Sequence, residues 1–220
     1  MSQQSRKDEH DAYWMMLMGQ VQVSLAGASN AELKVQVFDV LDEFFMGSNC
    51  WQEAVTFTVI PNTLDYPVNV TTGRISKLYA VIDQNNVPQP AFMPTVGIIH
   101  VPFAYTTVQP MTAVLTKTVT DPLRCFPPHI PDWTLPRYRL GLQHGVLGNM
   151  MQQPGMSWSN PQLALFHLQK FRDEISHARV AMTTQNAVGA QNWKFPQQFR
   201  VTGQKGGVST FNVTPAARQT

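Results

Sequence analysis

A few acidic and histidine side chains in the second half of the chain have the spacing of metal ligands. Asp173 and His177 are four residues apart, so one turn of a helix would bring them together as two ligands of an ion such as zinc. No third ligand is evident, and an exposed ion pair on a helix has the same spacing. His144 and His167 fall in two separate predicted helices, which is more typical of helix-surface or interface residues than of an acid–base pair. We predict no metal and no other cofactor.

Nucleophile, phosphate and thiol motifs are incomplete. The run Gly155-Met-Ser157-Trp-Ser159 lacks the closing glycine of a nucleophile elbow. The run Gly203-Gln-Lys-Gly-Gly207 lacks the Lys-Ser/Thr ending and the preceding strand of a phosphate loop, so a flexible arm is the better interpretation. Cys50 and Cys125 have no CxxC partner. These patterns do not indicate an enzyme.

Two helices are predicted at the start of the chain. The first covers Asp11 to about Ala26, because apolar residues recur at helical spacing, and Gly27 ends it. Ser29 and Glu32 have the spacing of a capping box that begins a second helix, which ends near Gly47. Its apolar stripe consists of Leu33, Val37, Val40, Leu41 and Phe44. Such a short connection predicts an antiparallel hairpin.

The apolar period changes from helical to two at Trp51. Alternating residues predict strands at 51–59 and 74–82, with further strands at 96–101 and 111–119. Several short strands separated by turns suggest a small antiparallel sandwich or barrel.

Helical periodicity returns after the proline-rich run 126–131. Asp132 or Thr134 is expected to cap a third helix, and Ser159-Asn160-Pro161 to begin a fourth. The inner face of the third is Tyr138, Leu142, Val146 and Met150, and the stripe of the fourth is Leu165, Leu168, Phe171, Ile175, Ala178 and Met182. Gly141, Gly145 and Gly148 weaken the third helix, and close helix packing would explain their presence.

These elements predict an α+β fold with three parts. Residues 1–50 and 132–184 form an antiparallel bundle of two helical hairpins, residues 51–131 form the inserted β domain, and residues 185–220 form an extended C-terminal arm. The arm lacks periodicity but keeps aromatic residues, so we expect it to become ordered on a partner.

Composition favours assembly over an isolated monomer. Only 14% of the 220 residues are charged, and Gln, Asn and Thr take the place of charge. The arm carries four basic and no acidic residues, too dispersed for a strong phosphate track. The polar N-terminus does not read as a signal peptide, and no apolar run is long enough to span a membrane, so we expect reduced thiols and synthesis in the cytoplasm.

The order of these patterns resembles the head-to-tail adaptor (connector) proteins of tailed bacteriophages. The resemblance extends from the first helix to about Arg179. The stretches that carry it are Ser29–Leu33 with Phe38–Phe45, Trp51 with Val55–Phe57, Gly73–Tyr79 with Val87–Pro88, Leu135–Tyr138 with His144–Leu147, Gln153–Gly155, Trp158–Pro161, and Phe171 with Ala178–Arg179. The turn Trp158-Ser159-Asn160-Pro161 is its most telling piece. Residues 148–151 and the arm depart from the family pattern.

The resemblance implies a structural virion protein. Such proteins form a ring, usually of twelve copies, in the neck of the virion: it binds the portal above and a tail, nozzle or tail-tube protein below. The ring extends the DNA channel, helps to retain the genome until ejection and lets double-stranded DNA pass without sequence recognition. The chain would be assembled in the host bacterial cytoplasm. The arm residues expected to dock on the portal or a neighbour are Trp193, Lys194, Phe195, Phe199, Arg200 and Phe211.

Two other classes of protein remain as alternatives. A β-rich carbohydrate- or receptor-binding tail module would use exposed aromatic residues such as Trp51, Tyr79 and Tyr105. A hydrolase or metal enzyme would depend on Asp173 or His177.

Overall fold

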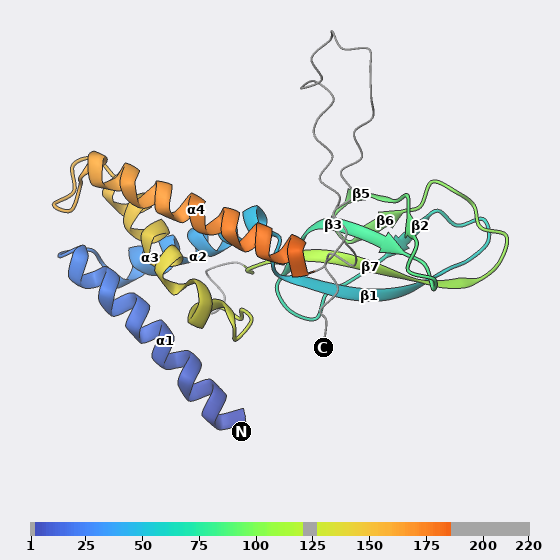
Figure 1. Ribbon diagram of the computed structural model, residues 1–220, viewed down its shortest axis with the longest axis horizontal. Helices are drawn as coiled ribbons and strands as arrows, with labels where there is room; N and C mark the ends of the chain where they lie inside the picture. Colours follow the sequence, from blue (N-terminus) through green and yellow to red (C-terminus); the bar gives the residue numbers. More distant parts are fainter. Residues whose placement is uncertain (1–2, 121–126, 186–220) are drawn as a thin grey trace, which may run out of the picture. The chain divides into compact units, whose positions relative to one another are not determined.

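The computed structural model describes residues 3–120 and 127–185, which belong to one compact unit. Within these ranges the chain is an α+β protein with four helices and two antiparallel sheets (Figure 1). The helices surround one hydrophobic core and the strands another.

The first two helices follow the predicted stripes. Helix α1 (Gln3–Ser24) buries Trp14, Leu17 and Val21, Leu25 directly after it is buried as well, and the helix begins earlier than expected. Helix α2 (Asn30–Ser48) starts with the predicted capping box: Glu32 N donates to Ser29 Oγ, and Ser29 N donates to the Glu32 carboxylate. All five predicted residues of its stripe are buried.

Helix α3 (Thr134–Met151) begins without the predicted side-chain cap. Trp133 occupies the capping position, and Thr134 is already helical with a buried hydroxyl oxygen that has no hydrogen-bond partner. The prediction that Asp132 or Thr134 caps this helix was therefore wrong. Its predicted inner face is buried throughout.

Helix α4 (Pro161–Gln185) begins where the sequence predicted. Asn160 is its cap, since Leu163 N donates to Asn160 Oδ1 at 3.1 Å. Its buried stripe is Ala164, Phe171, Ile175 and Ala178. Leu165, predicted to be buried, is 65% exposed. The alanine next to it faces the core instead and starts the stripe one residue earlier.

The helices pack mainly around α3. Helices α3 and α4 lie side by side, and both contact α2, while α1 packs against α3 (Figure 1). The predicted α1–α2 hairpin is not confirmed, because the main helix contact of α1 is with α3. The glycines of α3 allow the close approach: a Cβ atom at Gly145 would lie 2.6 Å from Val40 Cγ1, and one at Gly148 would lie 2.7 Å from Leu168.

The strands form two antiparallel sheets. The first has the order β1-β7-β3-β4 and consists of β1 (Gln52–Val59), β7 (Gln109–Thr118), β3 (Arg74–Ile82) and β4 (Pro88–Gln89). The second has the order β2-β6-β5 and consists of β2 (Asp65–Pro67), β6 (Ile98–His100) and β5 (Phe92–Thr95). Both sheets contribute buried residues, among them Val59, Met111 and Ile99, to one core.

Helix α2 is tied to the first sheet by a polar junction. Asp42 accepts hydrogen bonds from Arg74 on β3, at 2.8 Å, and from the hydroxyl of Thr118 on β7. Trp51, directly before β1, is buried in the helical core beside Phe45. These contacts attach the β region to α2.

Candidate interaction surfaces and polar sites

The turn Trp158-Ser159-Asn160-Pro161 joins α3 to α4. Asn160 N donates to Met151 O at 3.0 Å, which closes the turn, and Pro161 is the first residue of α4. The Trp158 ring packs against the helical core, where a Cβ atom at Gly27 would lie 3.6 Å from it. Its indole nitrogen is buried without a partner. The turn thus places Trp158 against the helical core, whereas Asn160 and Pro161 at its end are exposed.

The six arm residues named above, Trp193 to Phe211, and also Cys125 lie outside the described residues. Their part in docking therefore stays a prediction.

His144 on α3 and His167 on α4 are brought together. Their Nδ1 atoms lie 2.7 Å apart and their ring centroids 4.9 Å apart, so one imidazole donates a hydrogen bond to the other. Burial lowers the pKa of both histidines; Lys170 lowers that of His144 further, and His144 lowers that of His167 further. Both rings therefore favour the neutral form, as a donor–acceptor pair requires.

The other metal-ligand candidates are not grouped. Asp173 and His177 are exposed on α4, and the described part of the chain holds no cluster of three or more metal-ligating side chains. Burial raises the pKa of the Cys50 thiol, which favours the less reactive protonated form. No helix among the described residues is long and apolar enough to cross a membrane.

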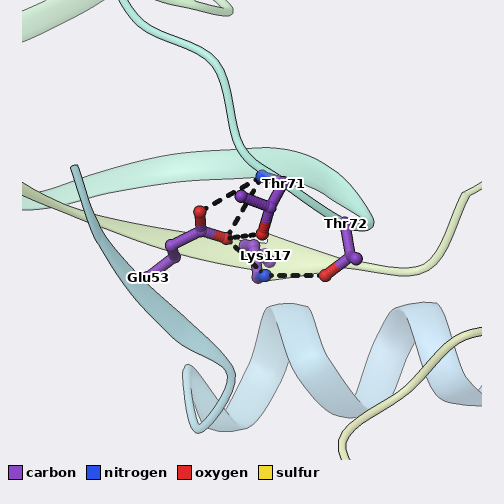
Figure 2. A network of polar contacts seen from close by, with 4 residues as sticks. All are labelled: Glu53, Thr71, Thr72 and Lys117. Carbon is purple, nitrogen blue, oxygen red and sulfur yellow. Dashed lines mark hydrogen bonds and ion pairs between the residues drawn. The ribbon is translucent and has the colours of Figure 1, made fainter.

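A polar network that the sequence did not predict lies on the first sheet (Figure 2). Lys117 on β7 is buried, and its Nζ atom donates to Glu53 Oε2 at 2.6 Å and to Thr72 Oγ1 at 3.1 Å. The backbone N–H and hydroxyl of Thr71 both donate to the same carboxylate. The ammonium also lies 4.7 Å from the centroid of the Trp51 ring. The network holds the segment before β3 against β1 and β7.

This network sets the charge state of Glu53. Burial by itself raises the pKa of Glu53, but hydrogen bonds from Lys117 and Thr71 outweigh it, so the pKa lies below its ordinary value. The carboxylate stays ionised at neutral pH as the partner of Lys117. We infer that the Glu53–Lys117 network stabilises the fold, because the hydrogen-bond partners of both side chains belong to the fold itself.

Helix α1 carries apolar residues on both sides. Opposite the buried stripe, Ala12, Met16, Gly19 and Val23 are spaced by four, three and four residues and so share a second face. Met16 and Val23 on this face are 46% and 85% exposed, and Met16 Sδ also accepts a hydrogen bond from Arg139 Nη1 of α3. This surface has the character of an uncovered contact face.

A groove of 590 Å³ runs between β3 and the segment 88–96. Its lining includes Lys77, Tyr79, Gln89, Phe92 and Val96, and Tyr79 is 49% and Phe92 52% exposed. Of the three aromatic residues proposed for glycan recognition, only Tyr79 lines the groove. Trp51 is buried, because it packs under α2, and Tyr105 is half-buried against the β core.

No protein-family model matches this chain, and no curated protein matches it.

Proposed function

We propose that this chain is a structural virion protein: an adaptor subunit that forms a ring under the portal, extends the DNA channel and carries the tail. Within it, the four helices would form the bundle of the ring body, with the β region as the inserted domain. The arm from residue 185 would dock on the portal or on a neighbouring copy. Double-stranded DNA would pass through the ring without specific contacts.

The observation that carries this proposal is the second apolar face of α1. A helix that is apolar on one side fits a monomer, whereas a helix that is apolar on two sides needs cover on both. Val23, 85% exposed, would otherwise leave most of its side chain in water. A ring subunit covers two flanks with copies of itself through head-to-tail contacts. The low charge content of the whole sequence agrees with extensive subunit contact.

Portal rings of the same virus provide the decisive test. The purified chain is mixed with portal rings, sedimented and imaged by negative stain, and we expect an added ring at the narrow end of each portal. A chain truncated after Ala181 should keep a folded bundle but lose portal binding. Undiminished binding by the truncated chain would show that the arm is not the docking element.

Two variants test whether the second apolar face of α1 is a contact between subunits. Val23→Lys places a charge at the most exposed apolar residue of the proposed contact and should abolish ring formation on portals. Gln22→Lys adds the same charge next to it, at a position that is polar already, and should leave the ring intact. Equal assembly by both variants would exclude this face as a subunit contact.

The groove beside β3 supports a second candidate, a carbohydrate- or receptor-binding tail module. Tyr79 and Phe92 offer exposed rings for stacking on a sugar, and Gln89 offers an amide. Glycan-array binding by the isolated chain, lost in Tyr79→Ala, would favour this function over assembly.

A further inference from the structure

Strand β1 has one paired and one unpaired edge. All eight of its residues pair with β7 in a continuous antiparallel register, from Gln52 opposite Thr116 to Val59 opposite Gln109. In the strand order β1 is terminal, and no strand among the described residues pairs with its other side (Figure 1). A row of backbone donors and acceptors is therefore left for a partner.

The register shows which backbone groups face outward. Lys117 N donates to Trp51 O at 2.8 Å, so Trp51 and Lys117 belong to a hydrogen-bonded pair. Hydrogen-bonded and non-hydrogen-bonded pairs alternate along an antiparallel ladder. The N–H and C=O groups of Ala54, Thr56 and Thr58 consequently point away from β7. The side chains of these three residues are exposed as well.

The opposite edge of the same sheet is protected, and β1 is not. The pairing of β3 with β7 is interrupted by bulges between Ile75 and Lys77 and between Leu78 and Ala80, and β4 covers its end. Bulges and charged residues such as Lys77 are the usual means by which proteins block strand addition. Strand β1 has no bulge and no proline, and its one charge, Glu53, is neutralised by Lys117.

The C-terminal arm contains a segment with the same pattern as β1. Ser209-Thr-Phe-Asn-Val213 matches Val55-Thr-Phe-Thr-Val59 at the threonine, the phenylalanine and the last valine. The wider segment 208–214 is uncharged, free of proline and rich in β-branched and aromatic residues, which favours a strand. Phe211 and Val213 would share one face of it.

The two faces of such a strand fit the two faces of β1. Val55 and Phe57 pack against the β core and are only partly covered at the edge. An added strand would place Phe211 and Val213 beside them and extend that apolar face. Its other face, Thr210 and Asn212, would lie beside the exposed threonines of β1, and cross-strand threonine pairs are favourable.

We propose that residues 208–214 of one copy bind as an added strand along the β1 edge of a neighbouring copy. The part of this inference that concerns a neighbour rests on the proposed assembly. The 22 residues from 186 to 207 could span up to about 75 Å when extended, which is enough to reach an adjacent subunit. Main-chain hydrogen bonds would supply affinity, and the side-chain alternation would set the register.

A labelled peptide of residues 206–215 tests the binding site directly. It is titrated by fluorescence anisotropy into a chain that ends at Gly206, which keeps both described cores. We expect saturable binding and at least tenfold slower deuterium exchange of amides in 52–59, with no change in 74–82. Protection of 74–82 instead of 52–59 would overturn the proposal.

Matched variants distinguish strand addition from nonspecific binding of the peptide. Thr56→Pro removes one outward N–H and leaves the hydrogen bonds between β1 and β7 intact, so the affinity for the peptide should fall at least tenfold. Thr56→Ala keeps the N–H and should change the affinity less than twofold. On the peptide, Phe211→Ser should weaken binding at least tenfold and Asn212→Ser less than twofold. The peptide variants decide the question even if Thr56→Pro fails to fold.

Exchange between copies is tested with two full-size partners. The full chain with Thr56→Pro can donate its arm but cannot receive one, and the chain ending at Gly206 can only receive. Neither should associate alone, and their mixture should form a complex. No complex, despite peptide binding, would overturn exchange between copies. If the chain ending at Gly206 adds a ring to portals but never binds the peptide, strand addition fails while the adaptor function stands.

Discussion

Replacing Gly145 by alanine should destabilise the protein, although alanine is the better helix former. Gly145 lies in α3 where α2 and α4 both approach. A Cβ atom there would lie 2.6 Å from Val40 Cγ1 and 3.1 Å from the Phe171 ring, and both neighbours are buried. Val40 is β-branched and Phe171 is fully enclosed, so neither can move aside without shifting its helix.

Two opposing contributions determine the size of the effect. Alanine in place of glycine favours a helix interior by about 1 kcal/mol. Overpacking of a well-packed core costs about 1–3 kcal/mol, and a contact of 2.6 Å belongs at the upper end of that range. The net result is a loss of about 1–2 kcal/mol in the free energy of unfolding.

Gly19→Ala is the matched control, because α1 has nothing within 4 Å of a Cβ atom at that position. Only the propensity gain applies there, so the isolated chain should be stabilised by about 1 kcal/mol. Urea unfolding followed by far-UV circular dichroism compares the two variants with the native chain at constant m-value. Equal stabilisation by both substitutions would refute the close packing of α3 against its neighbours.

Three further predictions concern polar groups. Lys117→Met leaves the Glu53 carboxylate without its cation and should cost about 3 kcal/mol in urea unfolding at pH 7. Because the pKa of Glu53 is lowered in the folded state, the native chain should lose this stabilisation as the pH falls below about 4.5, a dependence that should be weaker in the variant, which keeps only the Thr71 hydrogen bonds. Because the pKa values of His144 and His167 are lowered in the folded state, the unfolded state binds protons at a higher pH than the folded state does. The free energy of unfolding should therefore fall between about pH 7 and 5. His167→Gln should reduce that fall, as measured by unfolding midpoints in a pH series. Trp158→Phe removes a buried N–H that has no partner, so it should change the unfolding free energy by less than about 1 kcal/mol; a larger loss in urea unfolding would show that the indole N–H has a bonded role.

Local features of the fold could be predicted because they depend on neighbours in sequence. The capping box of Ser29 and Glu32 joins groups three residues apart, and the start of α4 at Pro161 depends on the residue before it. The stripe of α2 and the alternation of β1 are periodic patterns that any buried helix or half-buried strand shows. The range of β3 also agrees with the sequence prediction.

Long-range partners could not be predicted in the same way. Glu53 and Lys117 are 64 residues apart, and nothing in the spacing of either indicates a buried ion pair. The meeting of His144 and His167 depends on the rotation of α3 and α4 about their axes. Trp51, which the glycan-binding alternative would need to be exposed, is buried, because the connection from α2 to β1 places it beside Phe45 in the helical core.

The sequence by itself determined the four helices of the described residues, the strands β1, β3, β6 and β7 to within a few residues, and the glycines that mark a close contact on α3, whereas the short strands β2, β4 and β5 were not predicted. Only the tertiary structure decided which surfaces remain open. It places α1 against α3, turns Leu165 outward and leaves the β1 edge unpaired while β3 is bulged and covered. The physical reason is that the periodicity of a segment indicates which of its faces is buried, but not against which element. The choice of partner depends on contacts between segments far apart in the chain.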